Sequence, residues 1–414
     1  MNRFERFFYN IVRFSPKIKR LIVYLYHRLF SFIPVKKIQT DYNITIREGF
    51  FFGFHDKCPW SPDNKFILAH KYPTDLIMPS SNEKVEIGYF SGKNQTNFNS
   101  IATSSTWNWQ MGSMLQWLSN TNNIIFNDYD GENHIAKVLD LKGKLLKKYQ
   151  LPIAAVSSNG DWALSYSFIR LRKAAPAYGY ANSDDISASE NIPNNDGIYL
   201  LNLRNGKSKL LFSIFEISEV DAGNYPNDSY HYFTHCVFSP SGKRFTFFHR
   251  WLEKNNQTWT RLFTCNIDGS DIFKFDFSGV VTHLAWQDNK HLLAYGYKKN
   301  VGDHYYLLKD KTNSFKIIGK NHFTSDGHPQ FTPDRESFIT DTYPDRLRRQ
   351  YLIRYNVNLK KRDDLVILKS PLLYTGDIRC DLHPRWDRMG KSIALDSSHT
   401  GKRALCTIRL DQLK

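Results

Sequence analysis

The chain has 414 residues, 41% of them hydrophobic and 15% aromatic, a composition that excludes disorder over most of its length and provides for a large core. Its 56 lysines and arginines outnumber 40 aspartates and glutamates, and the net charge of +16 predicts attraction to an anionic partner: nucleic acid, a membrane surface or an acidic polymer. The length leaves the number of domains open, because a single all-β domain can exceed the usual domain size.

The first 37 residues form a distinct basic segment. They hold nine basic side chains and one acidic one, so their net charge of +8 is half that of the whole chain. Apolar residues recur here at intervals of three and four, which is the period of one helix face, and they predict a pair of amphipathic helices broken near Pro16. The longest uncharged apolar run, residues 21–26, is far shorter than the roughly 20 residues that cross a bilayer.

We therefore expect residues 1–40 to be membrane-associating helices, with residues 1–37 lying against an anionic membrane surface. An amphipathic helix packed on the protein's own body or on a partner is the alternative. The five cysteines are scattered and form no CxxC pair, which argues against a disulfide framework and favours a reducing compartment. Without a signal cleavage site, the predicted location is cytoplasmic, peripheral on the inner face of the membrane.

One pattern recurs along the rest of the chain: an aromatic or apolar residue, a turn of the Ser-Pro-Asp-Gly type, and a β-rich run. Most of the intervals between copies are close to the roughly 40–50 residues of a four-stranded propeller blade. The pattern predicts an all-β chain whose residues 41–414 form a seven-bladed β-propeller of TolB-like or WD40-like blades. The seven copies centre on Trp60, Trp117, Val156, Phe238, Trp286, Phe331 and Trp386.

The last copy ends before it can supply a fourth strand. The alternating run Tyr42–Arg47 precedes the first copy, and we expect it to provide the missing outer strand and close the ring. A long insertion, at about 168–232, is rich in Pro, Ala, Ser, Asn and Asp and predicts long loops on one face of the propeller.

The repeat also carries chemistry, because four copies have a histidine three residues before the central residue. Equivalent positions in a propeller surround the channel, so the four imidazoles are expected to converge near one mouth; they are His235, His283, His328 and His383. Imidazole suits both metal binding and proton transfer near neutral pH. The first copy has Lys57 at this place and His55 two residues earlier. A repeated structural histidine that only bonds its own blade is the alternative interpretation.

Other side chains near these positions suit an anionic ligand. Guanidinium groups bind carboxylates in bidentate fashion, and Asp381 could complete a metal shell. Trp109 and Gln110 precede the second copy, where an aromatic face could stack on a sugar, although a core position is the more common role. Tyr178 lies on the inserted loop as a candidate proton donor, or as an ordinary packing residue. The candidate arginines are Arg250, Arg379, Arg385 and Arg403.

At these residues the sequence resembles the oligogalacturonate lyases and related propeller polysaccharide lyases. The resemblance is strongest in DKCPWSPDNKFILAH, FTHCVFSPSGKRFTFFH, VTHLAWQDNKHLLAY and DLHPRWDRMGKSIALDSSHTGKRAL. It implies a seven-bladed propeller acting on uronate oligosaccharides with a manganese-type metal, with His235 as the base and His283 and His383 as metal ligands. Asp381 stands where the family has a further histidine, and a glutamine ligand of the family has no match, so the metal site is either altered or replaced by arginines.

The resulting functional hypothesis is a carbon–oxygen lyase that cleaves an acidic, uronate-containing polysaccharide by β-elimination. The predicted roles are His235, Arg250, Tyr178 and Arg379 in catalysis, His55, Lys57, Trp109, Gln110, Arg385 and Arg403 in substrate binding, and His283, His328, Asp381 and His383 around a divalent metal, with Mn²⁺ the first candidate. The alternative is a non-catalytic, membrane-tethered propeller that binds an anionic glycan or protein. No recognition-helix pattern supports nucleic-acid binding.

Overall fold

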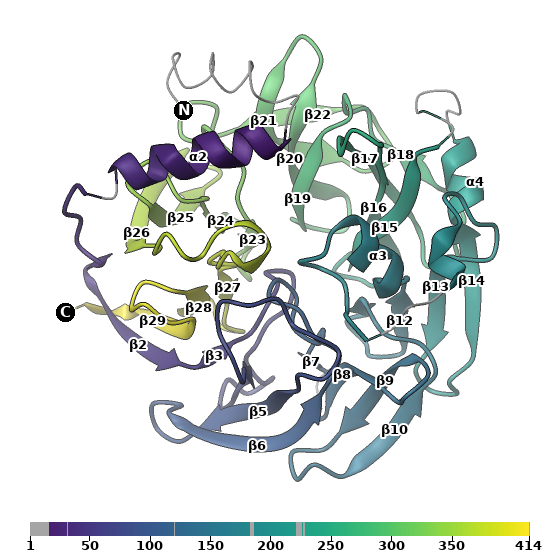
Figure 1. The fold of residues 1–414 in the computed structure, drawn as a ribbon, viewed down its shortest axis with the longest axis horizontal. Coiled ribbons are helices and arrows are strands. Elements are labelled where there is room, and N and C mark those ends of the chain that lie inside the picture. Colours follow the sequence, from purple (N-terminus) through teal and green to yellow (C-terminus); the bar gives the residue numbers. More distant parts are fainter. Residues whose placement is uncertain are drawn as a thin grey trace.

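Seven antiparallel sheets surround a central axis in the computed structural model, which describes residues 16–30, 32–119, 121–182, 186–220, 226 and 228–413 (Figure 1). The ring confirms the predicted seven-bladed propeller. We number the sheets as blades 1 to 7 in chain order.

The first four blades each contain four strands in sequential order. Blade 1 is β3 (Phe50–Phe51), β4 (Ile67–Lys71), β5 (Val85–Ser91) and β6 (Asn97–Ser104). Blade 2 is β7 (Gln116–Trp117), β8 (Ile124–Tyr129), β9 (His134–Leu139) and β10 (Leu145–Tyr149). Blade 3 is β11 (Ala155–Val156), β12 (Trp162–Ser165), β13 (Gly197–Asn202) and β14 (Ser208–Ser213). Blade 4 is β15 (Tyr230–Phe238), β16 (Arg244–Leu252), β17 (Thr258–Asn266) and β18 (Phe273–Lys274).

The last two blades recruit strands from the N-terminal part of the chain. Blade 5 is still sequential, with β19 (Val281–Trp286), β20 (His291–Lys298), β21 (Gly302–Lys309) and β22 (Phe315–Ile318). Blade 6 is β23 (Gln330–Phe331), β24 (Ser337–Asp341), β25 (Arg349–Asn356) and β26 (Lys361–Lys369), with β1 (Ile38–Gln39) added at its edge. Blade 7 is β27 (Arg385–Trp386), β28 (Ser392–Ser397) and β29 (Ala404–Leu413), with β2 (Tyr42–Glu48) outermost.

The position of β2 confirms the predicted closure. Ile44 pairs with Ile408 and Ile46 with Cys406, so the N-terminal strand completes the sheet that contains the C-terminal strand. Arg47 then reaches blade 1, where its Nε donates to the Gln95 carbonyl at 2.8 Å. The first and last blades are thus joined through one strand.

The recurring turn has a simple chemical origin. In blade 1 the Ser61 hydroxyl accepts a hydrogen bond from the Phe66 amide at 3.0 Å, and the Ser61 amide donates to the Phe66 carbonyl at 3.0 Å. A short polar side chain after the central residue therefore closes the hairpin between the first two strands. In the same way, the amides of Trp162, Arg244 and Ser337 donate to the side-chain hydroxyls of Ser157, Ser239 and Thr332, respectively.

A polar residue near the end of the second strand links neighbouring blades. His70 of blade 1 accepts a hydrogen bond from the Ser113 amide through Nε2 at 3.1 Å. Asn127 of blade 2 bonds both the amide and the carbonyl of Ile153, at 2.7 and 2.9 Å. The equivalent residues in blades 6 and 7 are Asp341 and Asp396.

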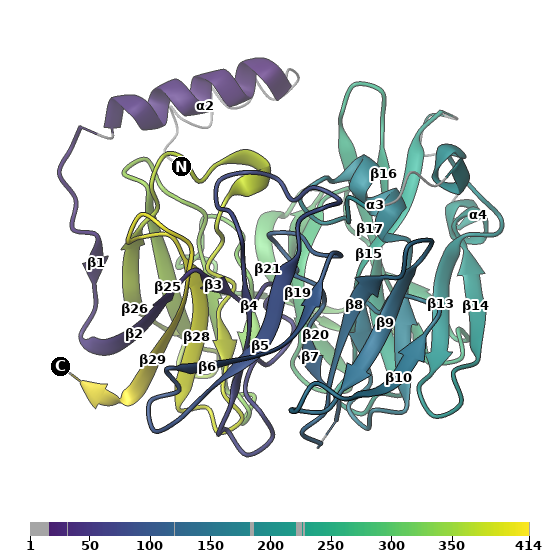
Figure 2. The ribbon, with the colours of Figure 1, turned by 60° about the horizontal axis from the view of Figure 1, so that its bottom comes forward.

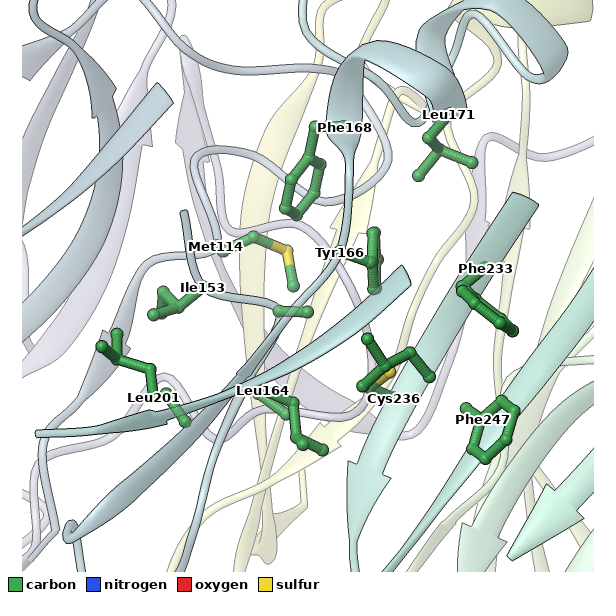
Figure 3. Packing of buried hydrophobic residues seen from close by; sticks show 14 of the residues in the cluster. Met114, Ile153, Leu164, Tyr166, Phe168, Leu171, Leu201, Phe233, Cys236 and Phe247 are labelled. Carbon is green, nitrogen blue, oxygen red and sulfur yellow. The ribbon is translucent and has the colours of Figure 1, made fainter. Parts of the chain in front are cut away.

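The core lies between the faces of adjacent blades. The largest cluster of buried hydrophobic residues runs from blade 2 to blade 4 and includes Leu164, Tyr166, Phe233 and Phe247, which lie close together in Figure 3. All five cysteines are free thiols, in agreement with the absence of a predicted disulfide framework.

The inserted region consists of two separate loops rather than one. Helix α3 (Phe168–Ala174) and the 3₁₀ helix η1 (Ile186–Ser189) follow β12, whereas α4 (Ile214–Glu219) follows β14. Strands β13 and β14 of blade 3 lie between them, so the predicted span of about 168–232 also includes regular blade structure.

One helix precedes the propeller. Helix α2 (Pro16–Phe30) lies across one end of the ring, on the side where α3 projects (Figure 2). The predicted helix before Pro16 lies outside the described residues. Within the described part of the chain, no helix is long and apolar enough to cross a membrane.

Candidate functional site

Histidines from successive blades meet at one end of the channel. The ring centroids of His283 and His328 are 4.0 Å apart, those of His328 and His383 are 4.2 Å apart, and His235 lies 6.1 Å from His283. His55 of blade 1 completes the group at 5.4 Å from His328. We call these five residues the histidine cluster. The predicted convergence of the imidazoles is confirmed.

Phe54 lies in the middle of the histidine cluster. Its ring centroid is 4.9 Å from that of His235 and 5.0 Å from that of His383, and its side chain is buried. This apolar ring contributes to the burial of the imidazoles and contacts both His235 and His383.

Hydrogen bonds determine which nitrogen of each imidazole is available. His383 Nδ1 lies 2.9 Å from the Gly53 carbonyl, and a carbonyl can only accept, so Nδ1 carries the proton and Nε2 has a free lone pair. His328 Nδ1 lies 2.8 Å from Asp341 Oδ1. Among the described residues, neither Nε2 has a hydrogen-bond partner, although both atoms are buried.

Asp341 holds two of these residues at once. Its Oδ1 accepts hydrogen bonds from both the amide and the ring of His328, and its Oδ2 accepts one from the His383 amide at 3.1 Å. This interblade position fixes the distance between the two imidazoles. His383 also has a φ of 42°, a left-handed backbone conformation that is uncommon outside glycine and that the Asp341 contact helps to maintain.

Burial keeps most of the histidine cluster neutral. It lowers the pKa of His283 to about 4 and holds the pKa values of His55 and His383 well below the ordinary value. The pKa of His235 is lowered in the same way, first by burial and then by the Arg250 charge. Burial also opposes the charged form of His328, but the Asp341 carboxylate outweighs it and raises the pKa.

Three of the four predicted metal ligands come together. Potential ligand atoms of His328, Asp381 and His383 all lie within 4.8 Å of one another, and all three side chains are buried. Two buried imidazole Nε2 atoms without hydrogen-bond partners, beside a carboxylate, suit a divalent cation, which would displace the Nε2 proton of His328 on binding. His283 lies beside this set, with its Nδ1 3.4 Å from an Asp326 oxygen. The donor set therefore fits the predicted metal.

Asp381 also belongs to a second group. Arg379 Nε donates to Asp381 Oδ2 at 2.7 Å, and Arg379 Nη2 donates to the Tyr178 hydroxyl at 2.7 Å. Burial disfavours the charge on Arg379, but the Asp381 carboxylate raises its pKa well above the usual value. The Tyr178 ring lies 6.2 Å from that of His235. The inserted loop thus brings a phenol and a guanidinium to the edge of the histidine cluster.

Two further cations lie near His235. The Arg250 guanidinium lies 5.2 Å from the centre of the Phe248 ring, and its charge contributes to the lowered pKa of His235. Lys57 Nζ forms an ion pair with Asp56 at 2.8 Å. Arg250 and Lys57 thus lie near the histidine cluster, as the sequence analysis predicted, and their roles in catalysis and binding stay predictions.

The predicted substrate-binding role of Arg385 is not supported by its position. Its side chain is 0% exposed, it donates to Asp396 at 2.7 Å, and it also donates to the carbonyls of Gly53 and Phe54. Arg385 therefore joins blade 7 to blade 1 and supports the segment that carries Phe54 and His55.

The same correction applies to Arg403, Trp109 and Gln110, all of which are buried. The Arg403 guanidinium lies 4.2 Å from the centre of a Trp109 ring and donates to the Ile378 and Arg379 carbonyls. Gln110 Nε2 also donates to the Arg379 carbonyl, at 3.3 Å. These side chains form the support behind Arg379 rather than a surface for a sugar.

The sequence analysis assigned no role to Phe54, Asp326 or Asp341. One signal could have found Asp326, because it lies two residues before His328, as Asp381 lies two before His383 and His55 two before Lys57. This position contributes to the site in three consecutive blades around the ring. Phe54 has no comparable signal.

No family model and no curated protein matches the chain. Its fold matches that of an oligogalacturonate lyase in complex with manganese, with a TM-score of 0.63 and 14% identity over 90% of this chain and 94% of that one. An oligogalacturonate lyase from Vibrio parahaemolyticus matches with a TM-score of 0.59 and 12% identity over 90% and 97%. The resemblance to oligogalacturonate lyases is thus confirmed for the fold.

Proposed function

We propose that this protein is a lyase that cleaves a uronate-containing glycan by β-elimination at the mouth of the propeller channel. The observation that carries the proposal is the neutral, buried His235 beside Arg250 and near a metal-type donor set. The likeness in fold to oligogalacturonate lyases agrees with it.

The reaction begins with proton abstraction by His235. Its lowered pKa leaves the imidazole unprotonated at neutral pH, so the ring can accept the C5 proton of a uronate. The electron pair of the C5–H bond forms the C4–C5 double bond, the C4–O bond breaks, and the leaving oxygen takes a proton. The two products are an unsaturated uronate and a free sugar hydroxyl.

A uronate C5 proton is too weakly acidic for imidazole unless the neighbouring carboxylate is neutralised. Arg250 is the chain's own group for this task, because it lies beside His235. A divalent cation would supply further charge neutralisation at the carboxylate. His328, Asp381 and His383 would hold it, with Mn²⁺ the first candidate, and Arg379 would orient Asp381.

Tyr178 is the proposed proton donor. Arg379 donates to its oxygen, which leaves the phenolic hydrogen directed to another acceptor, and the adjacent His235 places the phenol near the reacting sugar. Lys57 and His55 line the side of blade 1 and are the proposed contacts for other parts of the glycan.

The test is the appearance of unsaturated uronate, which absorbs in the far ultraviolet. We expect purified protein with Mn²⁺ and uronate polymers to give rising absorbance, chelation to reduce the rate, and His235→Ala to abolish it. His304→Ala is the matched control, because His304 is a half-buried histidine on β21 outside the histidine cluster, and it should retain the activity.

The absence of product from every uronate glycan tried, together with the absence of bound metal by elemental analysis, would reject the lyase. Retained binding of an acidic glycan in that case, lost on Arg250→Ala, would indicate the non-catalytic alternative.

A further inference from the structure

Helix α2 carries an apolar face that the ring does not cover. Ile22, Leu25 and Leu29 follow one another at intervals of three and four, and their side chains are 38%, 53% and 68% exposed. Phe32 and Ile33, just beyond the helix, continue the stripe at 80% and 44% exposed. Side chains at these intervals share one side of a helix. We call these five residues the apolar stripe.

The other side of α2 contacts blade 6. The Arg346 guanidinium lies 5.7 Å from the centre of the Phe30 ring, and the Arg346 backbone bonds His27. His27 is partly buried there, and burial followed by the nearby Arg348 charge lowers its pKa. The propeller therefore holds one side of the helix, as the alternative prediction of packing on the protein's own body expected, and presents the apolar stripe outward.

The surroundings of the apolar stripe are basic. Residues 1–37 have a net charge of +8, and among the described residues Arg28, Lys36 and Lys37 are exposed beside the stripe. Arg346, which holds Phe30, is exposed as well. A second copy of this surface would be repelled by like charge, whereas a bilayer with anionic headgroups complements both the charge and the apolar side chains.

The helix lies at the same end of the ring as the histidine cluster. Asp341 ends β24 and bonds His328, and the loop 342–348 leads directly from Asp341 to the residues that contact α2. Figure 2 shows α2 across this end. The apolar stripe and the histidine cluster therefore lie at the same end of the ring.

We propose that this end of the ring docks on an anionic lipid bilayer through the apolar stripe, so that the channel mouth opens at the membrane surface. It follows, on the basis of the proposed lyase function, that the substrate is an acidic glycan attached to or lying along a membrane. A soluble oligosaccharide would need no such orientation.

The binding test uses the full chain and sedimentation with vesicles. We expect binding to vesicles of phosphatidylcholine and phosphatidylglycerol in equal parts, weaker binding in high salt, and little binding to phosphatidylcholine alone. Leu25→Ser with Leu29→Ser should weaken binding by about 10-fold to 100-fold. Leu359→Ser is the control, because Leu359 is 75% exposed in the β25–β26 turn at the opposite end of the ring, and it should bind like the parent.

Orientation is tested with an environment-sensitive fluorophore on one introduced cysteine. Leu373→Cys lies in the loop before β27 on the mouth side and should report an apolar environment when vesicles are added, whereas Leu359→Cys should not.

Undiminished binding of the double serine variant, or a signal from position 359 in place of 373, would overturn the proposal. So would a dimer that the double variant disrupts while no vesicle binds, because the stripe would then be a contact between copies. Vesicle binding is independent of catalysis, so these outcomes are separate from failure of the lyase assay.

Discussion

At the scale of the residue, Asp341 links structure to chemistry. It is buried, and it bonds the ring of His328 and the amides of both His328 and His383. A carboxylate behind a metal-binding imidazole fixes the ring and increases its basicity. Asp341 is therefore a positioning residue.

Replacing this carboxylate should weaken metal binding more than it harms the fold. Asp341→Asn removes the charge that raises the pKa of His328, and we expect Mn²⁺ affinity to fall by about 10-fold to 100-fold in calorimetric titration. The matched control is Asp310→Asn, because Asp310 is also buried and bonded, to Arg244 and Thr264, but lies in blade 5 outside the histidine cluster. Equal affinity of the Asp341→Asn variant and the parent would contradict the assigned role.

At the scale of the element, the ring depends on β2 as its closing strand. Arg47 anchors the end of β2, because it is buried, bonds the Asn94 and Gln95 carbonyls of blade 1, and also donates to Thr407 of β29. Its guanidinium is 5.0 Å from the centre of the Phe90 ring. One side chain thus connects three segments that are distant in sequence.

Arg47→Met should lower the free energy of unfolding by about 2–3 kcal/mol, because bonds to a buried charged group are lost. Arg409→Met on the neighbouring strand β29 is the control, since Arg409 is exposed and pairs with Asp411; its effect should stay within about 0.5 kcal/mol. Chemical denaturation measures both. Similar losses from the two variants would indicate that β2 closes the ring without the Arg47 anchor.

The elements that could be predicted from the sequence are those set by local pattern. The turn residues after Trp60 and its equivalents bond within a few positions, so their spacing reveals the blades, and the alternation in Tyr42–Arg47 reveals the closing strand. Convergence of the histidines follows from their equivalent places in the repeat.

The roles that could not be predicted depend on partners far along the chain. Arg385 and Arg250 are both arginines near the repeat, but the carbonyl acceptors of Arg385 lie more than three hundred residues away in blade 1. Such distant contacts decide whether an arginine side chain stabilises the fold or is available to bind a ligand. For the same reason the role of Asp341 could not be predicted, because its second partner, His383, lies in the next blade.

At the scale of the whole molecule, the ring is stabilised by polar links between blades, and one of them titrates. Burial lowers the pKa of His70 to about 3, and its Nε2 must stay unprotonated to accept the Ser113 amide of blade 2. The unfolded chain binds a proton near pH 6.5 and the folded chain does not, so the stability contributed by this group is lost as the pH falls below about 6.5.

When the pH is lowered from 7 to 5, the titration of His70 should lower the free energy of unfolding by about 2 kcal/mol. His70→Gln keeps an acceptor for Ser113 without a titrating group, so its stability should fall by that much less over the same range. Denaturant titrations of both proteins at the two pH values measure the difference. An equal fall in both proteins would mean that His70 does not contribute to the loss of stability in acid.

The path of the chain from α2 into the propeller has a mechanical consequence. After the helix, β1 pairs with β26 of blade 6, and β2 pairs along β29 of blade 7, two strands in immediate succession. A force applied at the helix runs along these strands and loads their hydrogen bonds together, in shear, instead of opening them one at a time. The pairing of β2 with β29, which closes the ring, would carry this load. Tension from a fixed helix would therefore act on the strand that keeps the propeller closed.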